Sequence, residues 1–407
     1  MLRNRLLRQL TFGGLLFLLA LGFAQYKFGD GVEYFRLTRA MADWSDEESD
    51  KLSAQLVALK PEKAEYQFLR AKVLRRIGRF SEANTALQIA EKLKWPLNDI
   101  GREKILSVAQ SGGVRGVSRE ISLILNSNLP DAEAVEVYNA IANGHAAAYD
   151  IPEFMKCIDY WLKWQPEALR PKLLLADFLF RIGNHNGALQ EYQKIVEKSE
   201  GSWDARFGLA KCQLTLNDPG NAEKNFEICY QQRPSGKTAV NLAKCYARLE
   251  KSDEALQMLK KYQDEEDRST KAEILEELGR WHVERGLLDE ARGYIDECLK
   301  VAPENFSAWH ALSMIRSLQG DSDAAREALE HSQQLQKDAS RLLELVSELA
   351  DNPERDDFRL EAAQICFRNN RKSEALGWLN SILQRNPDHA EARETLKEYT
   401  SEKRPAP

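Results

Sequence analysis

The residue types that catalyse reactions or bind metal ions are present, but their spacing matches no known catalytic or metal site. No two of the six histidines lie four residues apart, and His282, in HVERG, lacks the second histidine of a metalloprotease helix. The six cysteines form no CxxC pair, which excludes a zinc ribbon and a thioredoxin-like motif. A GxSxG nucleophile elbow is also absent. We therefore predict a protein that is not an enzyme and needs no cofactor or metal.

One segment, PSGKT at Pro234–Thr238, ends like a phosphate-binding loop. That loop needs a glycine where this chain has Gln231, and it has to follow a strand, whereas a helical pattern precedes this segment. Gly236 and Lys237 are interpreted instead as a turn that opens a helix.

The overall composition indicates a folded protein that does not bind nucleic acid. Its 57 basic and 63 acidic residues are interspersed, and their net charge of −6 leaves no basic stripe. The 13 prolines and 22 glycines fall mostly at turn positions, which argues against a sheet-rich fold.

The chain is organised around a repeat that is clearest at Ser202–Pro234. Two amphipathic helices are predicted there, on either side of the polar turn NDPGN. Their inner faces carry Leu209 in the first helix, and Ala222 and Phe226 in the second. A large residue at position 7, small residues at 8 and 20, an aromatic at 24 and a proline at 32 resemble the 34-residue tetratricopeptide repeat.

Two unrelated residue types keep this period along the chain. The small residue of position 20 recurs as Ala83, Ala188, Ala222, Ala255, Ala291, Ala325 and Ala375. The closing proline recurs as Pro61, Pro96, Pro130, Pro166, Pro234, Pro303 and Pro387. Repeats are accordingly predicted to begin near Gly31, Ala64, Asp99, Val135, Leu169, Trp203, Gly236, Ala272, Phe306 and Asp356. The resemblance implies an all-α fold, a right-handed solenoid of helical hairpins of the tetratricopeptide type.

The predicted organisation places the array at residues 30–335, with roughly nine repeats. The early repeats are degenerate, because Arg70 occupies a leucine position and Ser118 and Phe154 replace small residues. An inserted helical extension is predicted at 336–355. A last repeat with a polar capping helix follows at 356–403, and a disordered tail at 404–407.

The insertion interrupts the period between the last two repeats. From Ser322 to Ala350 no Gly or Pro occurs and leucines follow a helical stripe, so one long helix is predicted. The alternative is a break at Lys337–Ala339, with Asp338 capping a new helix.

The N-terminus resembles an export signal. Met1–Gln9 carries three arginines and no acid, and Leu10–Ala24 follows without a charge. Extended to Phe28, the apolar stretch approaches the length that crosses a bilayer. Gly22 and Ala24 are placed like a signal-peptidase cleavage pair. Residues 1–29 are thus a signal anchor or a cleaved signal peptide.

Either outcome puts the repeats outside the cytoplasm by the positive-inside rule. We expect a single-pass protein of the inner (cytoplasmic) membrane, anchored through residues 10–28, with its repeats facing the periplasm or the cell exterior. The alternative is a soluble periplasmic or secreted protein, cleaved near Ala24.

Most cysteines and tryptophans are interpreted as core residues. Cys212, Cys229, Cys245 and Cys298 fall on packing faces, although a disulfide stays an alternative in an oxidising compartment. Packing positions are also predicted for Trp203, Trp281, Trp309 and Trp378. For Trp161 and Trp164 an exposed contact is the alternative to packing.

The resemblance also implies a binding surface. In tetratricopeptide proteins, positions 2, 5, 9 and 12 of the first helices line a concave groove that holds an extended peptide or a partner's helix. Carried over to this sequence, the candidate groove residues are Phe207, Lys211, Asn241, Lys244, Arg248, Glu273, Glu276, Arg280 and Glu284. A solvated face without a ligand is the alternative.

Along this groove, a patch of basic and polar residues would thus lie next to the acidic patch that begins at Glu273. The clamp with which some co-chaperones of this fold grip a C-terminal carboxylate is not reproduced, because Glu273 and Glu277 replace its final basic residues. The predicted function is a membrane-tethered, non-catalytic scaffold or adaptor that binds a protein or peptide partner. The alternative is a signal-cleaved binding subunit of a secretion, assembly or polysaccharide system.

Overall fold

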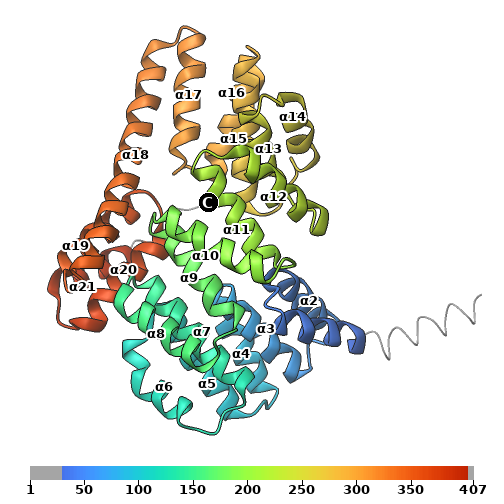
Figure 1. Ribbon diagram of the computed structural model, residues 1–407. Helices are drawn as coiled ribbons and strands as arrows, with labels where there is room; N and C mark the ends of the chain where they lie inside the picture. Colours follow the sequence, from blue (N-terminus) through green and yellow to red (C-terminus); the bar gives the residue numbers. More distant parts are fainter. Residues whose placement is uncertain (1–29, 402–407) are drawn as a thin grey trace, which may run out of the picture. The chain divides into compact units, whose positions relative to one another are not determined.

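The computed structural model describes residues 30–401, which consist of helices joined by turns (Figure 1). Contacts divide the chain into two compact units, Met1–Gly144 and His145–Pro407. The repeat pattern gave no sign of this division, since its period continues across the boundary. The anchor or signal predicted at 1–29 and the tail predicted at 404–407 lie outside the described residues. Within the described part, no helix is both long and apolar enough to span a bilayer.

The first unit is a series of antiparallel helices. A helix over residues 30–42 is followed by α2 (Asp46–Leu59), α3 (Ala64–Arg76), α4 (Phe80–Lys92), α5 (Leu97–Val108), the π-turn η1 (Ala109–Gly113), the 3-10 turn η2 (Arg115–Val117), α6 (Ser118–Leu125) and α7 (Asp131–Ala147), which ends just inside the second unit. Small residues let α3 and α4 approach closely, since Ala71 and Ala83 are fully buried between them.

Polar residues hold the degenerate repeats together where the pattern lacks apolar ones. Arg70 donates hydrogen bonds to the carbonyl oxygen of Asp50, at 2.8 Å, and to Ser53 Oγ, at 2.9 Å. These bonds join α3 to α2. Arg70 thus replaces the packing of the expected leucine with hydrogen bonds.

A second polar cluster is fully buried in this unit. Arg75 of α3 donates to Glu103 of α5 and, at 2.8 Å, to Glu136 of α7. Its third partner is Gln110 Oε1 in η1, at 2.7 Å, and Arg76 also bonds to Glu136. Arg75 thereby links α3 to three segments, and its guanidinium compensates the buried charges of Glu103 and Glu136.

The second unit consists of paired helices stacked in sequence. Its elements are α8 (Ile151–Trp164), α9 (Leu169–Arg181), α10 (His185–Lys198), α11 (Trp203–Thr215), α12 (Pro219–Gln232), α13 (Gly236–Arg248), α14 (Ser252–Lys261), α15 (Arg268–Glu284), α16 (Leu288–Val301), α17 (Phe306–Leu318), α18 (Ser322–Asp351), α19 (Asp356–Arg368), α20 (Lys372–Arg385) and α21 (Ala390–Ser401). The pairs α9–α10, α11–α12, α13–α14, α15–α16, α17–α18 and α19–α20 are hairpins.

Side chains of the connecting turns start several of these helices. Ser202, Asp267 and Asn305 each accept a hydrogen bond from a backbone N–H in the first turn of α11, α15 and α17. Gly286 and Gly320 adopt positive φ between the helices of two hairpins, a conformation that costs glycine little.

Helix α18 is a single helix of 30 residues, as the uninterrupted stripe predicted. Its first half packs against α17, where Ser332 Oγ donates to the carbonyl oxygen of Phe306 at 2.8 Å. Its second half packs against α19 through the buried Asp338, whose carboxylate accepts from Arg368 at 2.6 and 3.0 Å. Asp338 therefore does not cap a new helix, because it lies mid-helix and joins two hairpins.

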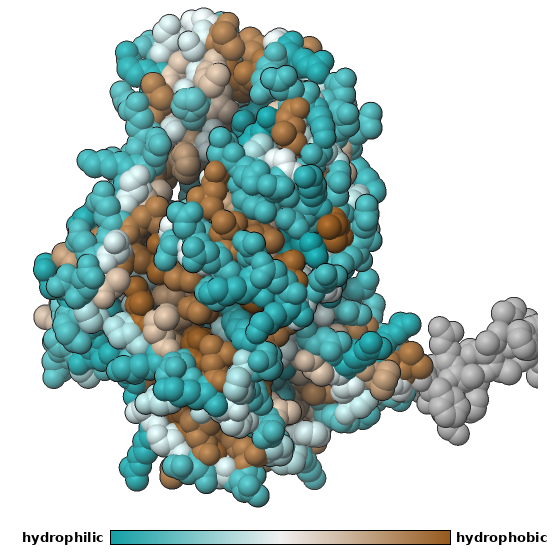
Figure 2. Space-filling model, viewed as in Figure 1, coloured by the Kyte–Doolittle hydropathy of each residue, from teal (hydrophilic) through white to brown (hydrophobic). Residues whose placement is uncertain are grey.

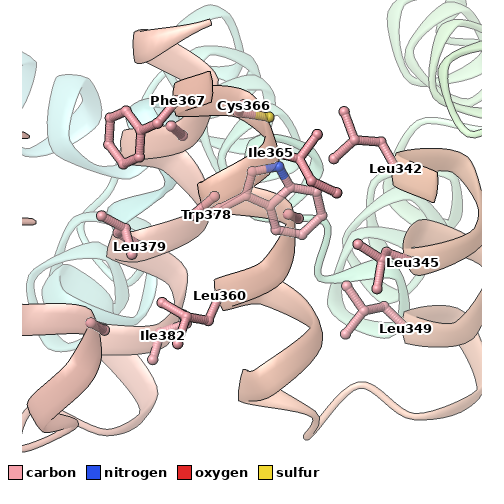
Figure 3. Close-up of a cluster of buried hydrophobic side chains, with 14 of the residues drawn as sticks. Leu342, Leu345, Leu349, Leu360, Ile365, Cys366, Phe367, Trp378, Leu379 and Ile382 are labelled. Atoms are coloured by element: carbon pink, nitrogen blue, oxygen red, sulfur yellow. The ribbon is translucent and has the colours of Figure 1, made fainter. Parts of the chain in front are cut away.

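The last repeat has its own core, shown in Figure 3. Trp378 of α20 is enclosed by Leu345 and Leu349 of α18 and by Leu360 of α19. The terminal helix α21 contributes Leu396 to the same cluster. Two contributors come from far earlier in the chain, Tyr149 and Ile182, which pack against this cluster.

The expected core positions are largely buried. All six cysteines lie in the described residues, and all are buried without a disulfide among them. Trp378 and Trp161 are buried, whereas Trp164 is 39% exposed. Trp203, Trp281 and Trp309 are half-buried, and each donates its indole N–H to a backbone carbonyl.

Candidate partner-binding surface

The first helices of successive hairpins form a continuous layer. Helices α9, α11, α13, α15 and α17 each contact the next, and their side chains on the open side form what we call the first-helix surface. The candidate residues belong to α11, α13 and α15, in the middle of this layer.

The prediction that Phe207 lines the groove is wrong, because Phe207 does not lie on the first-helix surface. It is only 5% exposed, because α11 is enclosed by its neighbours on most sides. Its ring stacks on Trp203 at 4.9 Å and meets Phe226 edge-on at 5.4 Å. Lys237 Nζ covers it, 5.1 Å from the ring centre. Phe207 is therefore a core residue, and Lys237 lies on the first-helix surface above it.

Three lysines gather where α11 and α13 meet α15, and we call Lys211, Lys237 and Lys244 the basic cluster. Lys244 Nζ pairs with Glu273 Oε2 at 2.5 Å. Lys211 is half-buried, with Nζ 4.6 Å from the ring centre of Phe180 on α9. Within the described part of the chain, Lys211 and Lys237 have no carboxylate at ion-pair distance.

The electrostatic environment of Lys211 favours an added negative charge. Burial lowers the pKa of its ammonium group, and the nearby Lys237 lowers it further, against the smaller opposing effects of Glu273 and Asp177. An anion bound between the two lysines would raise the pKa of Lys211 back towards its ordinary value. The basic cluster is thus suited to a carboxylate ligand.

Arg248 and Asn241 have roles within the fold. Arg248 Nη1 donates to the carbonyl oxygen of Leu214 at 2.5 Å, which ties α13 to the end of α11. Asn241 Nδ2 donates to the carbonyl oxygen of Lys237 at 2.8 Å, inside its own helix.

Acidic and apolar side chains line the surface beyond α13. Glu276 accepts from Asn305 Nδ2 at 2.8 Å, and Arg280 pairs with Glu277 at 3.2 Å. Glu277 is buried, and this burial raises the pKa of its carboxyl group. This hydrogen bond and this ion pair leave only parts of Glu276 and Arg280 for a ligand.

A cavity of about 530 Å³ opens beside Glu276 and Arg280. Phe306 and Met314 of α17 and Gln336 of α18 complete its wall, together with Val283, Glu284, Ser307, His310, Ala311 and Ser332. Met314 is 44% exposed. Figure 2 shows hydrophobic residues interspersed with hydrophilic ones over α17 and α18. We call this cavity the α15–α18 pocket. It can take an apolar side chain beside polar groups.

Several of these residues were missed by the sequence reasoning. Lys237 and Met314 occupy positions 2 and 9 of their repeats, so the same pattern could have found them. Gln336 gave no such signal, because it belongs to the part of α18 that departs from the repeat. The described residues contain no group of side chains arranged to hold a metal ion.

Comparisons with known proteins agree with this architecture. A family model described as tetratricopeptide repeat matches residues 173–237 and 336–390, and a second with the same description matches 306–338. The match at 336–390 begins inside α18, where that helix passes from one hairpin to the next. Proteins with these repeats are protein-interaction scaffolds, and neither model describes a catalytic domain.

Individual relatives are distant. The BBSome complex member BBS4 of Bos taurus is 23% identical over 151 residues, which are 37% of this chain and 29% of the relative's length. Among solved structures, a chain of the APC/C hetero-tetramer Cut9-Hcn1 has a TM-score of 0.39 at 14% identity, covering 92% of this chain and 84% of that one. PilW, a type IV pilus biogenesis factor, has a TM-score of 0.37 at 18% identity, covering 55% and 96%.

The repeat period, the stacked hairpins and the matching family models lead to one conclusion. The chain contains tetratricopeptide repeats and is built as an all-α solenoid of their hairpins.

Proposed function

We propose that this protein is a non-catalytic scaffold that holds an acidic segment of a partner protein on its first-helix surface. One observation carries the proposal: among the described residues, Lys244 is the one lysine of the basic cluster with an ion-paired carboxylate, Glu273, which leaves the charges of Lys211 and Lys237 for a ligand. Lys211 is half-buried in addition, so an acidic ligand gains more there than at a solvated lysine. The α15–α18 pocket, on the same layer, receives an apolar side chain of that segment.

The proposal includes a location for the protein. Residues 10–28 anchor it in the inner membrane, with the repeats on the extracytoplasmic side. The charged and apolar pattern of residues 1–24 supports this. Mass analysis of the N-terminus of the protein isolated from its native membranes tests the anchor. A mature chain that starts at Gln25 would replace it with a secreted binding subunit.

The basic cluster is tested by removing its unpaired charges. Lys211→Gln with Lys237→Gln leaves Lys244 and its ion pair intact. The matched control, Lys156→Gln with Lys163→Gln, removes two exposed lysines from α8. The probes are two fluorescein-labelled peptides of equal length, one of Glu and Leu and one of Lys and Leu, followed by anisotropy.

We expect the wild type and the control to bind the acidic peptide, and the double variant to bind it at least roughly tenfold more weakly. The affinity should fall with added salt. The stronger charge reversal, Lys211→Glu with Lys244→Glu, should abolish both peptide binding and partner capture from native membranes. Equal binding by the wild type and the neutralised variant, with unchanged melting temperatures, would place the binding surface elsewhere.

A further inference from the structure

The two ends of the second unit touch each other. The turn between α7 and α8 presents Tyr149, whose ring lies parallel to that of Trp378 in α20. The ring centres are 4.1 Å apart and the planes differ by 7°. Tyr149 Oη also donates to Glu374 Oε1, at 3.4 Å. A repeat array in which each hairpin contacts only its neighbours does not need such a contact.

Further groups hold the turn in position. Arg181 of α9 donates to the carbonyl oxygen of Ala146 at 2.6 Å, and its guanidinium lies 5.4 Å from the Tyr149 ring. Gly377 lies beside the turn, since a Cβ atom there would be in ordinary contact with the carbonyl oxygen of Ala147, at 3.7 Å. We call the contact between Tyr149 and the start of α20 the junction.

The junction differs from the interfaces inside the array. Neighbouring hairpins pack side by side and bury rows of apolar residues, such as Ala222, Phe226 and Cys229 of α12. The junction joins one turn to the N-terminal part of one helix, through one aromatic stack and one long hydrogen bond, and Ile182 and α8 make a few further contacts beside it. The core around Trp378 keeps its leucines from α18 and α19 when Tyr149 leaves. Separation at the junction therefore leaves both sides folded.

We propose that the junction is a reversible latch, whose opening lets the segments on its two sides move apart and admits a partner to the first-helix surface. Helices α9 to α18 lie between its two halves, so a closed junction fixes both ends of the first-helix layer. The joints between hairpins can share the movement in small rotations. Because both halves of the junction belong to one chain, their effective concentration is high. The junction can therefore re-form after it opens, although it is small.

Native-state hydrogen exchange of the full chain tests whether the latch opens. We expect the amides around Tyr149 and at the start of α20 to exchange through a shared opening that is at least tenfold more frequent than that of α11 and α13. Tyr149→Ser should accelerate exchange at the junction by a further tenfold and leave α11 and α13 unchanged. Tyr160→Ser, at an exposed tyrosine of α8, is the control that should change neither.

A disulfide across the junction should have the opposite effect to Tyr149→Ser and hold the latch closed. Ala147→Cys with Gly377→Cys places one thiol on each side of the junction, where the two backbones lie close together, and the six native cysteines are buried. After oxidation, junction exchange should slow at least tenfold, and reduction should restore it. Junction amides that exchange only with global unfolding in the wild type would overturn the latch. So would a Tyr149→Ser variant that destabilises the whole unit evenly.

Admission of a partner is measured separately. The acidic peptide described above should associate at least tenfold more slowly with the oxidised double-cysteine variant than with its reduced form. Equal rates would show that opening does not control access. This second test rests on the proposed function, whereas the exchange experiments need no ligand, so either idea can fail without the other.

Discussion

Gly144 of α7 passes so close to the carbonyl oxygen of Ala109 that a Cβ atom on Gly144 would lie 2.0 Å from it. The same atom would lie 2.5 Å from Val114 Cγ2. Ala109 begins the π-turn in which Gly112 adopts a φ of 101°. The absent side chain thus allows α7 to pack directly against an irregular backbone.

Gly144→Ala should therefore destabilise the first unit by at least about 2 kcal/mol, because neither backbone can retreat without breaking its packing. Gly101→Ala is the matched control, since a Cβ on Gly101 in α5 meets nothing within 4 Å. That variant should gain about 0.5–1 kcal/mol from its better helix propensity. Urea unfolding of both variants measures the difference, and similar shifts in the two would contradict the close approach.

Glu136→Gln should destabilise the first unit by about 3–5 kcal/mol, because it leaves the buried guanidinium groups of Arg75 and Arg76 without their shared carboxylate. Glu133→Gln, on the same helix, removes a carboxylate that pairs with Arg102 at the surface. Its cost should stay below about 1 kcal/mol. The two values come from denaturant unfolding at neutral pH, and equal costs would argue against a buried network.

The stabilising effect of Glu136 should disappear in acid. Burial alone would raise the pKa of its carboxyl group, but the charges of Arg76 and Arg75 outweigh burial and hold this pKa well below 4.5. A lowered native pKa adds stability above the unfolded value of about 4.5, and this stability is lost as the pH falls below it. The stability gap between the wild type and Glu136→Gln should narrow between about pH 5 and pH 3. A gap independent of pH would contradict this assignment.

The native cysteines should not react with thiol reagents. Burial raises the pKa of Cys157, Cys212, Cys229, Cys245, Cys298 and Cys366 to about 12 each, so little thiolate exists at pH 8. Titration with a chromogenic disulfide should give no thiol in the native protein and six after denaturation. Tyr160→Cys places a thiol at an exposed site and should react at once. Rapid reaction of any native cysteine would show a local opening.

The sequence predicted the clear repeats closely. Helices α11, α13, α17 and α19 begin at Trp203, Gly236, Phe306 and Asp356, the residues at which repeats were expected to start. Helix α15 begins earlier than the predicted Ala272, because Asp267 accepts a hydrogen bond from the N–H of Thr270 and so starts the helix before the repeat pattern does.

Contacts between distant repeats were not predictable. A period of about 34 residues specifies which faces meet in neighbouring hairpins, and it carries no information on pairs such as Arg75 with Glu136 or Tyr149 with Trp378. The same limit affected the candidate surface. The pattern placed Lys211, Lys244 and Glu273 on adjacent first helices, but burial of Phe207 depends on how Trp203 and Lys237 cover it.

The contact between Tyr149 and Trp378 also sets an order of assembly. A solenoid can fold one hairpin at a time, since each hairpin needs only its neighbour. The stack, by contrast, joins residues from opposite ends of the second unit, and contacts so distant in sequence form late. During synthesis the turn at Tyr149 emerges long before α20, and its ring lacks the Trp378 partner until α20 has been made.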